Sequence, residues 1–305
     1  MKGNSAGIVR PYDHGIFSWF GYRFPLEERM RMIKEAGYAA SSVWLGRTER
    51  MVREGERNLI PSIVRSLGLD FEYIHASYAN CNKIWSDSPD EREIIRSDYL
   101  GDIAYCAEHR IPTLVVHISK GLNPPGVKES GLEVIADLVR ASEDSGVVLA
   151  VENTRQPGHV DYILENIKSD HLAFCYDSSH DFLVGQPAGA LLERWATRLR
   201  ITHLSDNDGL SDKHWLPGLG NGPWERVARA FPVESFSGYL TLEVLPSSRE
   251  FAGGMEFLLL GRERLRWFEA LARKLRGAQA APQSTEAAGH GAHDAMPDEE
   301  GHRSR

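Results

Sequence analysis

The residues best suited to chemistry lie between Ile201 and Gly220, in a stretch that opens with an apolar segment. The stretch contains His203, Asp206, Asp208, Asp212 and His214. Imidazole and carboxylate side chains at this density are typical of a divalent metal site. Asp212 and His214 precede Pro217-Gly-Leu-Gly220, so the loop can turn their side chains back towards the end of the segment. A metal site here would need further ligands from other parts of the chain.

Five other apolar segments also end in a potential ligand. With His203, these segment-terminal residues are His75, His117, Glu152, Asp177 and Glu243. A single buried histidine is more often hydrogen-bonded than metal-bound, and a single acid can simply cap the next helix. Six such residues at equivalent positions are better explained by one shared site. His180, three residues after Asp177, can reach either the metal or a substrate oxygen.

The elements that must position these residues follow an alternating pattern. Apolar segments that we interpret as strands occupy residues 14–20, 39–45, 71–75, 113–117, 147–152, 172–177, 199–203 and 239–243. Helical segments follow them at about 25–36, 55–67, 88–108, 130–145, 159–167, 188–197, 224–231 and 255–276. Continuous apolar strands are typical of parallel sheets buried on both faces, so the pattern predicts a closed (β/α)8 barrel. A doubly wound open sheet is the alternative, but no GxGxxG turn follows the first strand.

The barrel is expected to form one domain over residues 1–276. From Gly277 onward the residues are small, polar and aperiodic, which predicts a disordered tail over residues 277–305. We interpret His290, His293 and His302 as part of this solvated tail rather than as metal ligands.

Composition narrows the class of protein. A net charge of −8 gives no basic field to attract a phosphate backbone. Cys81, Cys106 and Cys175 form no CxxC pair, so we expect buried thiols in a reducing compartment. No apolar run approaches the roughly 18 residues of a membrane helix, and the first residues lack the apolar core of a signal peptide. We therefore expect a cytoplasmic protein without a membrane partner. A homo-oligomer is compatible with the sequence.

Seven short motifs surround the candidate ligands. They are His75-Ala-Ser-Tyr78, Val116-His117, Val151-Glu152-Asn153, Tyr176-Asp177-Ser-Ser-His180, Thr202-His203-Leu-Ser-Asp206, Asp212-Lys-His214-Trp-Leu-Pro-Gly-Leu-Gly220 and Thr241-Leu-Glu243. Together they resemble the xylose isomerase-like superfamily of TIM barrels over about residues 12–275. Members of that superfamily include sugar and sugar-phosphate isomerases and epimerases, inosose-processing enzymes and endonuclease IV.

The epimerase branch of this superfamily implies a particular metal site. By resemblance, one divalent ion is held by Glu152, Asp177, His203 and Glu243, and His180 polarises the substrate. Mn²⁺ is the expected ion, with Zn²⁺, Co²⁺, Mg²⁺ and Fe²⁺ as alternatives. The implied enzyme is a metal-dependent isomerase or epimerase of a small sugar, sugar phosphate or cyclitol that acts through an enediolate. Glu152 and Glu243 would exchange the proton and His180 would donate to an oxygen. A dehydratase or lyase on a keto-sugar or keto-cyclitol would use the same site.

Endonuclease IV, a zinc-dependent nuclease of abasic DNA, provides the other alternative. Endonuclease IV binds three zinc ions through nine ligands. By resemblance, these ligands would fall here on the six segment-terminal residues and on His180, Asp212 and His214. All nine residue types are present. In the nucleases, however, Leu usually follows the tyrosine of the His-x-x-Tyr motif as a wedge into DNA, whereas Ala79 follows Tyr78 here. Nucleic acid is therefore the less favoured partner. In an isomerase or epimerase, the ligand-type residues outside the four-residue metal site would bind additional metal or contact the substrate. These residues are His75, His117, His180, Asp212 and His214.

Aromatic and cationic residues near the same segment ends are candidates for substrate contacts. Aromatic faces suit the C–H surfaces of a sugar, although isolated aromatic residues usually belong to the core. The aromatic candidates are Trp19, Phe20, Trp44, Tyr78, Trp85 and Trp215. Lys120, Arg155 and Lys213 lie in loops on the same side and could pair with an anionic group.

Overall fold

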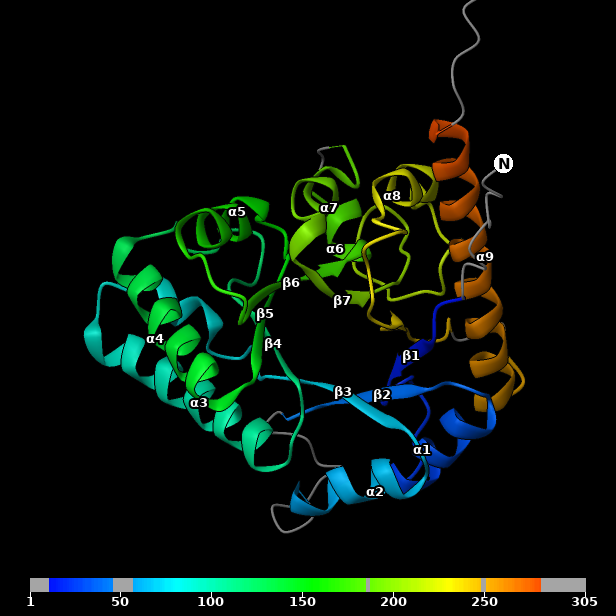
Figure 1. Cartoon of the computed structure of the whole chain (residues 1–305), viewed down its shortest axis with the longest axis horizontal. Coiled ribbons are helices and arrows are strands. Elements are labelled where there is room, and N and C mark those ends of the chain that lie inside the picture. Colours follow the sequence, from blue (N-terminus) through cyan, green and yellow to red (C-terminus); the bar gives the residue numbers. More distant parts are fainter. Residues whose placement is uncertain (1–10, 46–56, 185–186, 248–250, 281–305) are drawn as a thin grey trace, which may run out of the picture.

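The fold is a parallel (β/α)8 barrel, as the alternating pattern predicts. A computed structural model describes residues 11–45, 57–184, 187–247 and 251–280. Figure 1 shows the strands around a common centre and the helices outside them. The strands are β1 (His14–Phe17), β2 (Ala40–Trp44), β3 (Asp70–His75), β4 (Thr113–His117), β5 (Val148–Glu152), β6 (Leu172–Asp177), β7 (Leu199–His203) and β8 (Leu240–Leu242).

Helices connect successive strands and cover the outer face of the barrel. They are α1 (Leu26–Glu35), α2 (Ile60–Ser66), α3 (Pro89–Glu108), α4 (Glu129–Ser145), α5 (Pro157–Asn166), α6 (Ser178–Phe182), α7 (Ala190–Arg194), α8 (Trp224–Ala230) and α9 (Gly254–Ala280). Short 3-10 turns are η1 (Arg57–Leu59), η2 (Cys81–Trp85) and η3 (Ala196–Arg198). Local sequence explains several starts: Ser88 caps α3 by accepting from the Glu91 N–H, and Pro61 stands in the first turn of α2.

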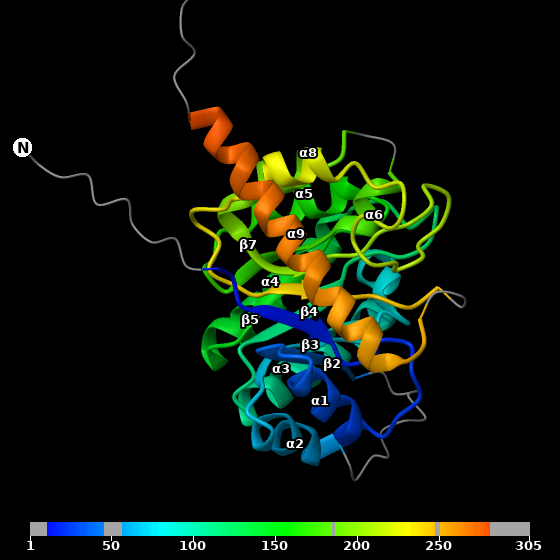
Figure 2. The same cartoon turned by 90° about the vertical axis from the view of Figure 1, so that its right-hand side faces the viewer.

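The sheet is continuous in the order β7-β6-β5-β4-β3-β2-β1-β8, and all its pairs are parallel. A parallel bridge between Leu204 and Leu242 joins the two outer strands, and the Leu204 N–H donates to the Thr241 carbonyl at 2.9 Å. The Thr202 hydroxyl adds two hydrogen bonds, because it donates to the Tyr239 carbonyl at 3.3 Å and accepts from the Thr241 N–H at 3.0 Å, so the barrel closes through a short seam. Helix α9 crosses this side of the molecule and packs against α8, α1 and β8 (Figure 2).

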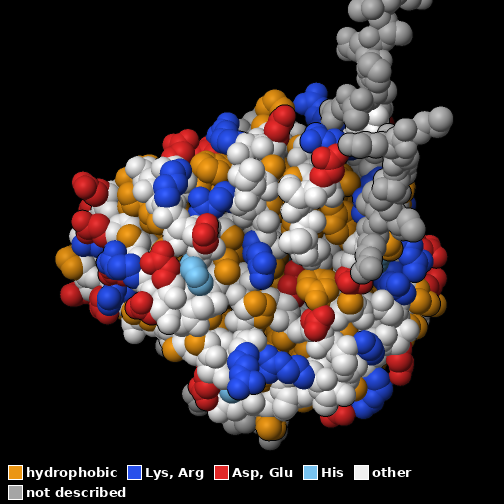
Figure 3. Space-filling view, viewed as in Figure 1, with side chains coloured by type: hydrophobic (Ala, Val, Ile, Leu, Met, Phe, Trp, Pro, Cys, Tyr) orange, Lys and Arg blue, Asp and Glu red, His pale blue; other side chains and the backbone are white. Residues whose placement is uncertain are grey.

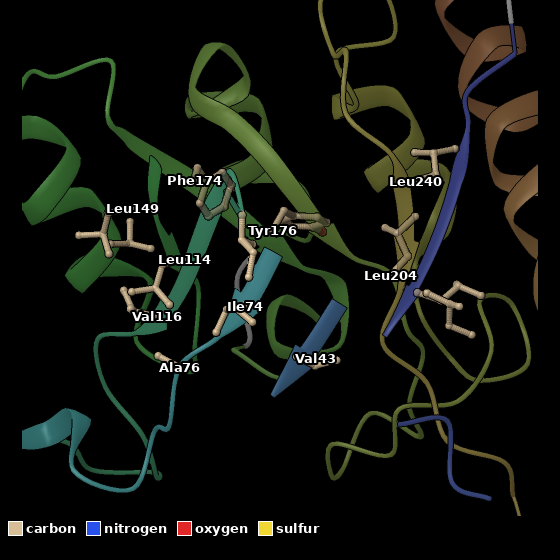
Figure 4. Close-up of a cluster of buried hydrophobic side chains, with 14 of the residues drawn as sticks. Val43, Ile74, Ala76, Leu114, Val116, Leu149, Phe174, Tyr176, Leu204 and Leu240 are labelled. Atoms are coloured by element: carbon tan, nitrogen blue, oxygen red, sulfur yellow. The ribbon is translucent and has the colours of Figure 1, made fainter. Parts of the chain in front are cut away.

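Alternate residues of β4 and β5 pack into two different cores. Leu114, Val116 and Leu149 belong to the large core between the sheet and the helices (Figure 4). Val115 and Ala150, which lie between them in sequence, belong to a smaller cluster inside the barrel. This follows from the period of two along a strand. The interior cluster consists of Phe17, Tyr73, Val115, Ala150, Ala173, Cys175 and Ile201.

Two helical regions differ from the sequence prediction. The segment after Asp177, which lies between the expected strand 172–177 and the expected helix 188–197, forms the short helix α6, because the Asp177 side chain accepts from the His180 N–H and caps a helical turn. The helix expected over 188–197 is the shorter α7 followed by η3.

The end of the barrel and the tail also differ in part from the prediction. Helix α9 continues beyond the expected end at Arg276 to Ala280, since Ala and Gln favour helix. Residues 281–305, which include His290, His293 and His302, lie outside the described residues, as do residues 55 and 56 of the second expected helix.

The described surface shows no purely basic face in the view of Figure 3, and the cysteines are buried as expected. Acidic and basic side chains are interspersed over the face in Figure 3. All three cysteines are free and buried. Within the described ranges, none of the helices combines the length and the apolar character required to cross a membrane.

The carboxyl group of Glu72 is buried inside the barrel. The pairing of β2 with β3 shifts register between Ser41 and Val43, which gives β3 an extra residue at this point. The Glu72 side chain then accepts a hydrogen bond of 2.6 Å from the Thr241 hydroxyl. A Cβ at Gly15 would overlap that hydroxyl, so glycine is required there. Burial raises the pKa of Glu72 to about 8, although Thr241 and His203 lower it in part.

Glu72→Gln should therefore become more stable relative to the wild type as the pH rises. The folded chain keeps the Glu72 proton up to about pH 8 while the unfolded chain releases it near pH 4.5, so the wild type loses stability between these values. The difference in free energy of unfolding between Glu72→Gln and the wild type should change by up to about 4 kcal/mol between pH 5 and pH 9. Urea denaturation in the presence of a chelator measures it. Glu225→Gln, at an exposed carboxylate, is the control, and parallel pH profiles for all three proteins would contradict the prediction.

Candidate functional site

The six strand-end residues identified from sequence meet at one mouth of the barrel. His117 and Glu152 lie two residues beyond the interior residues Val115 and Ala150, so the period of two directs their side chains inwards as well. The two are also paired across β4 and β5. His75, Asp177 and His203 likewise follow the interior residues Tyr73, Cys175 and Ile201 by two positions, and Glu243 directly follows the end of β8. The six residues are His75, His117, Glu152, Asp177, His203 and Glu243.

Glu152 is the centre of the cluster. Its Oε2 lies 3.1 Å from His75 Nε2, 3.3 Å from His117 Nε2 and 3.4 Å from His203 Nδ1, and its Oε1 lies 3.3 Å from His180 Nδ1. Burial alone would raise the pKa of Glu152, but the surrounding imidazoles hold it well below its usual value. The carboxylate is thus ionised although its side chain is almost entirely excluded from solvent.

Two overlapping groups of residues at this mouth could each hold a metal ion. Within each group, one ligand atom per residue lies within 4.8 Å of every other. The first group is Glu152, Asp177, His203 and Glu243. The second is His75, His117 and Glu152. Glu152 belongs to both.

The first group contains four buried polar atoms without a hydrogen-bond partner among the described residues. They are Glu152 Oε1, Asp177 Oδ2 and both ring nitrogens of His203. His203 Nδ1 lies 2.9 Å from Glu243 Oε2, yet the two are not aligned for a hydrogen bond. Buried polar atoms are rarely left unpaired, and a bound cation would take a lone pair from each of the two carboxylate oxygens and from one ring nitrogen of His203, whose other ring nitrogen carries the proton. The donor set and its orphaned atoms therefore fit a divalent ion.

Cys175 also lies within reach of this cluster, which sequence reasoning missed. Its sulfur forms a third possible ligand group with Glu152 and His203. Burial raises the pKa of the thiol far above its usual value, so Cys175 is a neutral thiol here. The strand pattern contained the signal, since Cys175 precedes Asp177 by two residues and must face the same way.

Asp212 joins His180 and His214 in a further group beside the first two. Its Oδ2 lies 3.2 Å from Nε2 of each histidine, and its Oδ1 accepts a hydrogen bond of 2.6 Å from the Ser179 hydroxyl. Burial acts against the charge of Asp212, but His180 and His214 lower its pKa strongly. All nine residues singled out from sequence are therefore neighbours, and Ser179 is an additional positioning residue.

His180 is oriented from both sides. Its Nδ1 donates to the Asn153 carbonyl at 2.9 Å, and Asn153 exchanges two side-chain hydrogen bonds of 2.8 Å with the backbone of Asp177. Burial would lower the pKa of His180, but Asp177, Asp212 and Glu152 together raise it well above its usual value. Asn153, which directly follows a ligand, thus fixes the relation between the ends of β5 and β6.

A pocket of about 230 Å³ opens above the cluster. Tyr78 is the aromatic residue among those that line it, stacked on His117 at 5.0 Å between centroids and on Trp44 at 5.9 Å. The lining residues are His75, Tyr78, His117, Ser119, Lys120, Gly121, Glu152, Thr154, Arg155, His180, Asp212, His214 and Glu243.

Most of the other aromatic and cationic candidates lie elsewhere. Phe20 and Trp85 are fully buried in the core, and Trp215 lines a separate cavity of about 100 Å³. Lys120 and Arg155 line the pocket, whereas Lys213 lies outside its lining and 3.8 Å from Asp208. Trp19 and Trp44 are partly buried against the cluster inside the barrel and are not among the lining residues of the pocket. The substrate-contact candidates therefore reduce to Tyr78 and the two cations.

Asp206 organises the loop that carries Asp212 and His214. Its backbone pairs with Trp215 through two hydrogen bonds of 2.8 Å. Its fully buried carboxylate accepts five hydrogen bonds of 2.7–3.0 Å. The donors are the N–H groups of Asn207, Gly218, Gly220 and Gly222 and the Trp224 indole. Asp206 is therefore an anchor of the loop, whereas its residue type and position suggested a ligand.

His214 adopts a left-handed backbone conformation with φ +51°. Such a conformation is uncommon for a residue with a side chain and needs support from its surroundings. The Leu245 N–H donates to the His214 carbonyl at 2.6 Å, and His214 Nδ1 lies 3.1 Å from the Glu243 carbonyl. These contacts fix the loop to the end of β8.

Comparison with known families agrees with this geometry. The family model described as the xylose isomerase-like TIM barrel matches residues 30–260. The chain belongs to this family.

Other proteins of known activity are similar to this member of the xylose isomerase-like family. Fructoselysine 3-epimerase of Escherichia coli O157:H7 is 24% identical over 247 residues, which cover 76% of this chain and 90% of that protein. The structure of L-ribulose 3-epimerase superposes with a TM-score of 0.72 at 15% identity, covering 89% of this chain and 99% of that one. The structure of 3-keto-D-glucoside 4-epimerase from E. coli gives a TM-score of 0.63 at 16% identity, over 85% and 100% of the two chains. At these identities the structural likeness shows the fold.

Asp206→Asn should destabilise the protein strongly. The amide nitrogen would face N–H donors that now point at a carboxylate oxygen, leaving buried donors unpaired, so the free energy of unfolding should fall by about 3 kcal/mol. Chemical denaturation measures the change. Asp208→Asn, in the same loop, is the matched control because its carboxylate accepts from only two N–H groups, those of Leu210 and Ser211. Equal effects of the two substitutions would show that Asp206 is not the anchor.

Proposed function

We propose that the chain is a divalent-metal-dependent isomerase or epimerase of a small polyhydroxylated carbonyl compound, such as a sugar, a sugar phosphate or a cyclitol. The observation that carries this proposal is the group Glu152, Asp177, His203 and Glu243, with its orphaned buried atoms, below a pocket of about 230 Å³. Pockets for drug-sized ligands are about 300–1,000 Å³, so this one suits a monosaccharide.

The four residues would hold the ion through carboxylate and imidazole atoms. This donor set suits Mn²⁺, our preferred ion, and also Zn²⁺, Co²⁺, Mg²⁺ and Fe²⁺. When bound, a divalent ion supplies Lewis-acid polarisation of a carbonyl and of an adjacent hydroxyl.

Glu243 is the residue best suited to remove the proton next to the carbonyl. Its side chain is 21% exposed and lines the pocket, whereas that of Glu152 is 1% exposed. Burial acts against the charge, but His203 and His214 lower the pKa of Glu243 to about 2, so the group is ionised. Glu152, which comes from β5 rather than β8, would return the proton or receive it in the reverse reaction.

His180 would donate a hydrogen bond to the substrate oxygen on which charge develops. Its Nδ1 proton is directed at Asn153, so the proton that faces the pocket is the one on Nε2, which the substrate oxygen would share with Asp212. Asp212, 3.2 Å from Nε2, keeps the imidazole protonated. Because such a donor is already in position before the reaction begins, it can stabilise the enediolate as the negative charge develops.

The comparisons favour epimerisation within this reaction class. The curated relative is named for epimerisation of fructoselysine at carbon 3, and a structural neighbour for that of L-ribulose at carbon 3. Carbon 3 is adjacent to the carbonyl of a 2-ketose, where an enediolate mechanism acts. A dehydratase or lyase on a keto-sugar or keto-cyclitol would begin with the same proton abstraction.

Glu243→Gln should strongly slow exchange of the substrate proton with solvent. In deuterated water the Mn²⁺-loaded wild type should incorporate deuterium next to the carbonyl of a ketose, and the variant should be slower by about 10²–10⁴-fold. Mass spectrometry of a panel of ketoses and inososes measures the exchange. Metal content is determined in parallel, since lost exchange with retained metal separates proton transfer from ligation. Glu225→Gln is the control. Absence of exchange by the wild type across the panel would refute the proposed function.

A second candidate function is zinc-dependent cleavage of abasic DNA. The observation in its favour is that all nine ligand-type residues lie together, in the first two groups, which share Glu152, and in the group around Asp212. The pair Tyr78-Ala79 counts against it, because the apolar wedge residue of the nucleases is missing.

Metal stoichiometry separates the two candidates. The epimerase proposal predicts about one tightly bound ion per chain and loss of activity on dialysis against a chelator. Elemental analysis by mass spectrometry gives the count, and an oligonucleotide duplex with one abasic site tests for cleavage. Three zinc ions per chain together with cleavage would instead support the nuclease.

A further inference from the structure

Two cations, Lys120 and Arg155, line the pocket beside the ligand cluster. We propose that the substrate carries an anionic group, a phosphate or a carboxylate, at the end of its carbon chain remote from the carbonyl, and that Arg155 and Lys120 bind this group. This inference rests on the proposed function, because it takes the carbonyl end of the substrate to lie at the metal-ligand cluster.

The positions of the two cations follow from the register of the barrel. His117 and Glu152 are paired across β4 and β5, and Lys120 and Arg155 each follow one of them by three residues. Three residues span at most about 10 Å, so both cations start at a similar height above the cluster and within that distance of it. Neighbouring strands are about 4.8 Å apart, which lets one phosphate or carboxylate contact both side chains.

Neither cation forms an ion pair with any carboxylate in the part of the chain that the structure describes. The Lys120 ammonium donates to the Ala79 carbonyl and keeps two further protons. The three carboxylates that line the pocket, those of Glu152, Asp212 and Glu243, all face histidines instead. Two cations in a pocket without an acidic partner are suited to an anion from outside.

The loops that carry the cations are held in place. The Asn82 side chain accepts from the Lys120 N–H at 2.8 Å and donates to the Lys120 carbonyl at 3.1 Å. Ser119 and Thr154, which directly precede the two cations, share a buried hydrogen bond of 2.6 Å between their hydroxyl groups. The loops after β4 and β5 are therefore joined directly before the two cations and form one wall of the pocket.

The lining of the pocket thus combines two kinds of chemistry. The carboxylates and imidazoles that would hold the ion include the strand-end residues, whereas the two cations follow His117 and Glu152 by three residues and directly follow the hydroxyl groups of Ser119 and Thr154. A phosphorylated ketose or a keto-sugar acid matches both kinds of chemistry, whereas a neutral ketose leaves the cations without a partner.

The test compares three ligands that differ only at carbon 6: fructose, fructose 6-phosphate and fructuronate. Equilibrium dialysis of radiolabelled ligand against the Mn²⁺-loaded protein gives each affinity without requiring turnover. At least one anionic ligand should bind more tightly than fructose to the wild type. Arg155→Gln should reduce that preference by about 10- to 100-fold, the loss expected for one charge-assisted hydrogen bond, and Lys120→Gln should reduce it as well. The two anionic ligands distinguish a phosphate site from a carboxylate site.

Lys213→Gln is the matched control, because it removes the same charge from a loop residue that lies outside the pocket lining and near Asp208. It should leave the ratio of affinities unchanged. The proposal is overturned if fructose binds as tightly as both anions, or if Arg155→Gln changes all three affinities equally. It is also overturned if Arg155→Gln only strengthens Mn²⁺ binding, as expected for a residue that merely balances the charge of the cluster.

A second measurement covers the case in which the fructose skeleton does not fit. Calorimetric titration with inorganic phosphate should show binding that weakens in Arg155→Gln and not in Lys213→Gln. If phosphate binding is the same in all three proteins, the anion site does not exist. Failure of the proposed function would instead appear as absence of deuterium exchange, which these binding measurements do not involve.

Discussion

The carboxylate of Glu152 is the group on which the arrangement of the site depends. It is excluded from solvent and faces imidazoles from β3, β4, β7 and the start of α6. A buried charge without such partners would be strongly destabilising. The four segments are far apart in sequence, so the charge can be accommodated only when the barrel has closed and brought their ends together. The barrel therefore cannot close around Glu152 without also assembling the site.

The strand ends could be predicted because two simple regularities coincide there. Strands alternate inward and outward residues, and parallel strands of a barrel finish on one side. A residue such as His117 or Glu152 at the end of an apolar run is thereby assigned both a direction and a location. The nine ligand-type residues can all be found in this way or by family resemblance, and the structure brings them together.

Features that depend on a particular contact could not be predicted. Asp206 has the residue type of a ligand, and its role as an anchor becomes visible only with the five donors around it. Helix α6 depends on one side-chain cap, and its five residues are too few to give a periodic pattern. The burial of Glu72 depends on a local shift of register between β2 and β3. One extra residue changes the alternation of polar and apolar residues in the sequence of β3 too little for the shift to be predicted.

The hydroxyl bridge between Ser119 and Thr154 has a consequence for how ligands are selected. Together with the contacts of Asn82 to Lys120, it makes the wall formed by the loops after β4 and β5 a preorganised surface. Because this wall is already ordered, the protein loses little conformational entropy when a ligand binds against it. The interaction free energy of a well-matched group therefore contributes almost undiminished to affinity. A mismatched group gains no compensation from rearrangement of the loops. Discrimination at this wall should therefore operate as recognition by a rigid template rather than by induced fit.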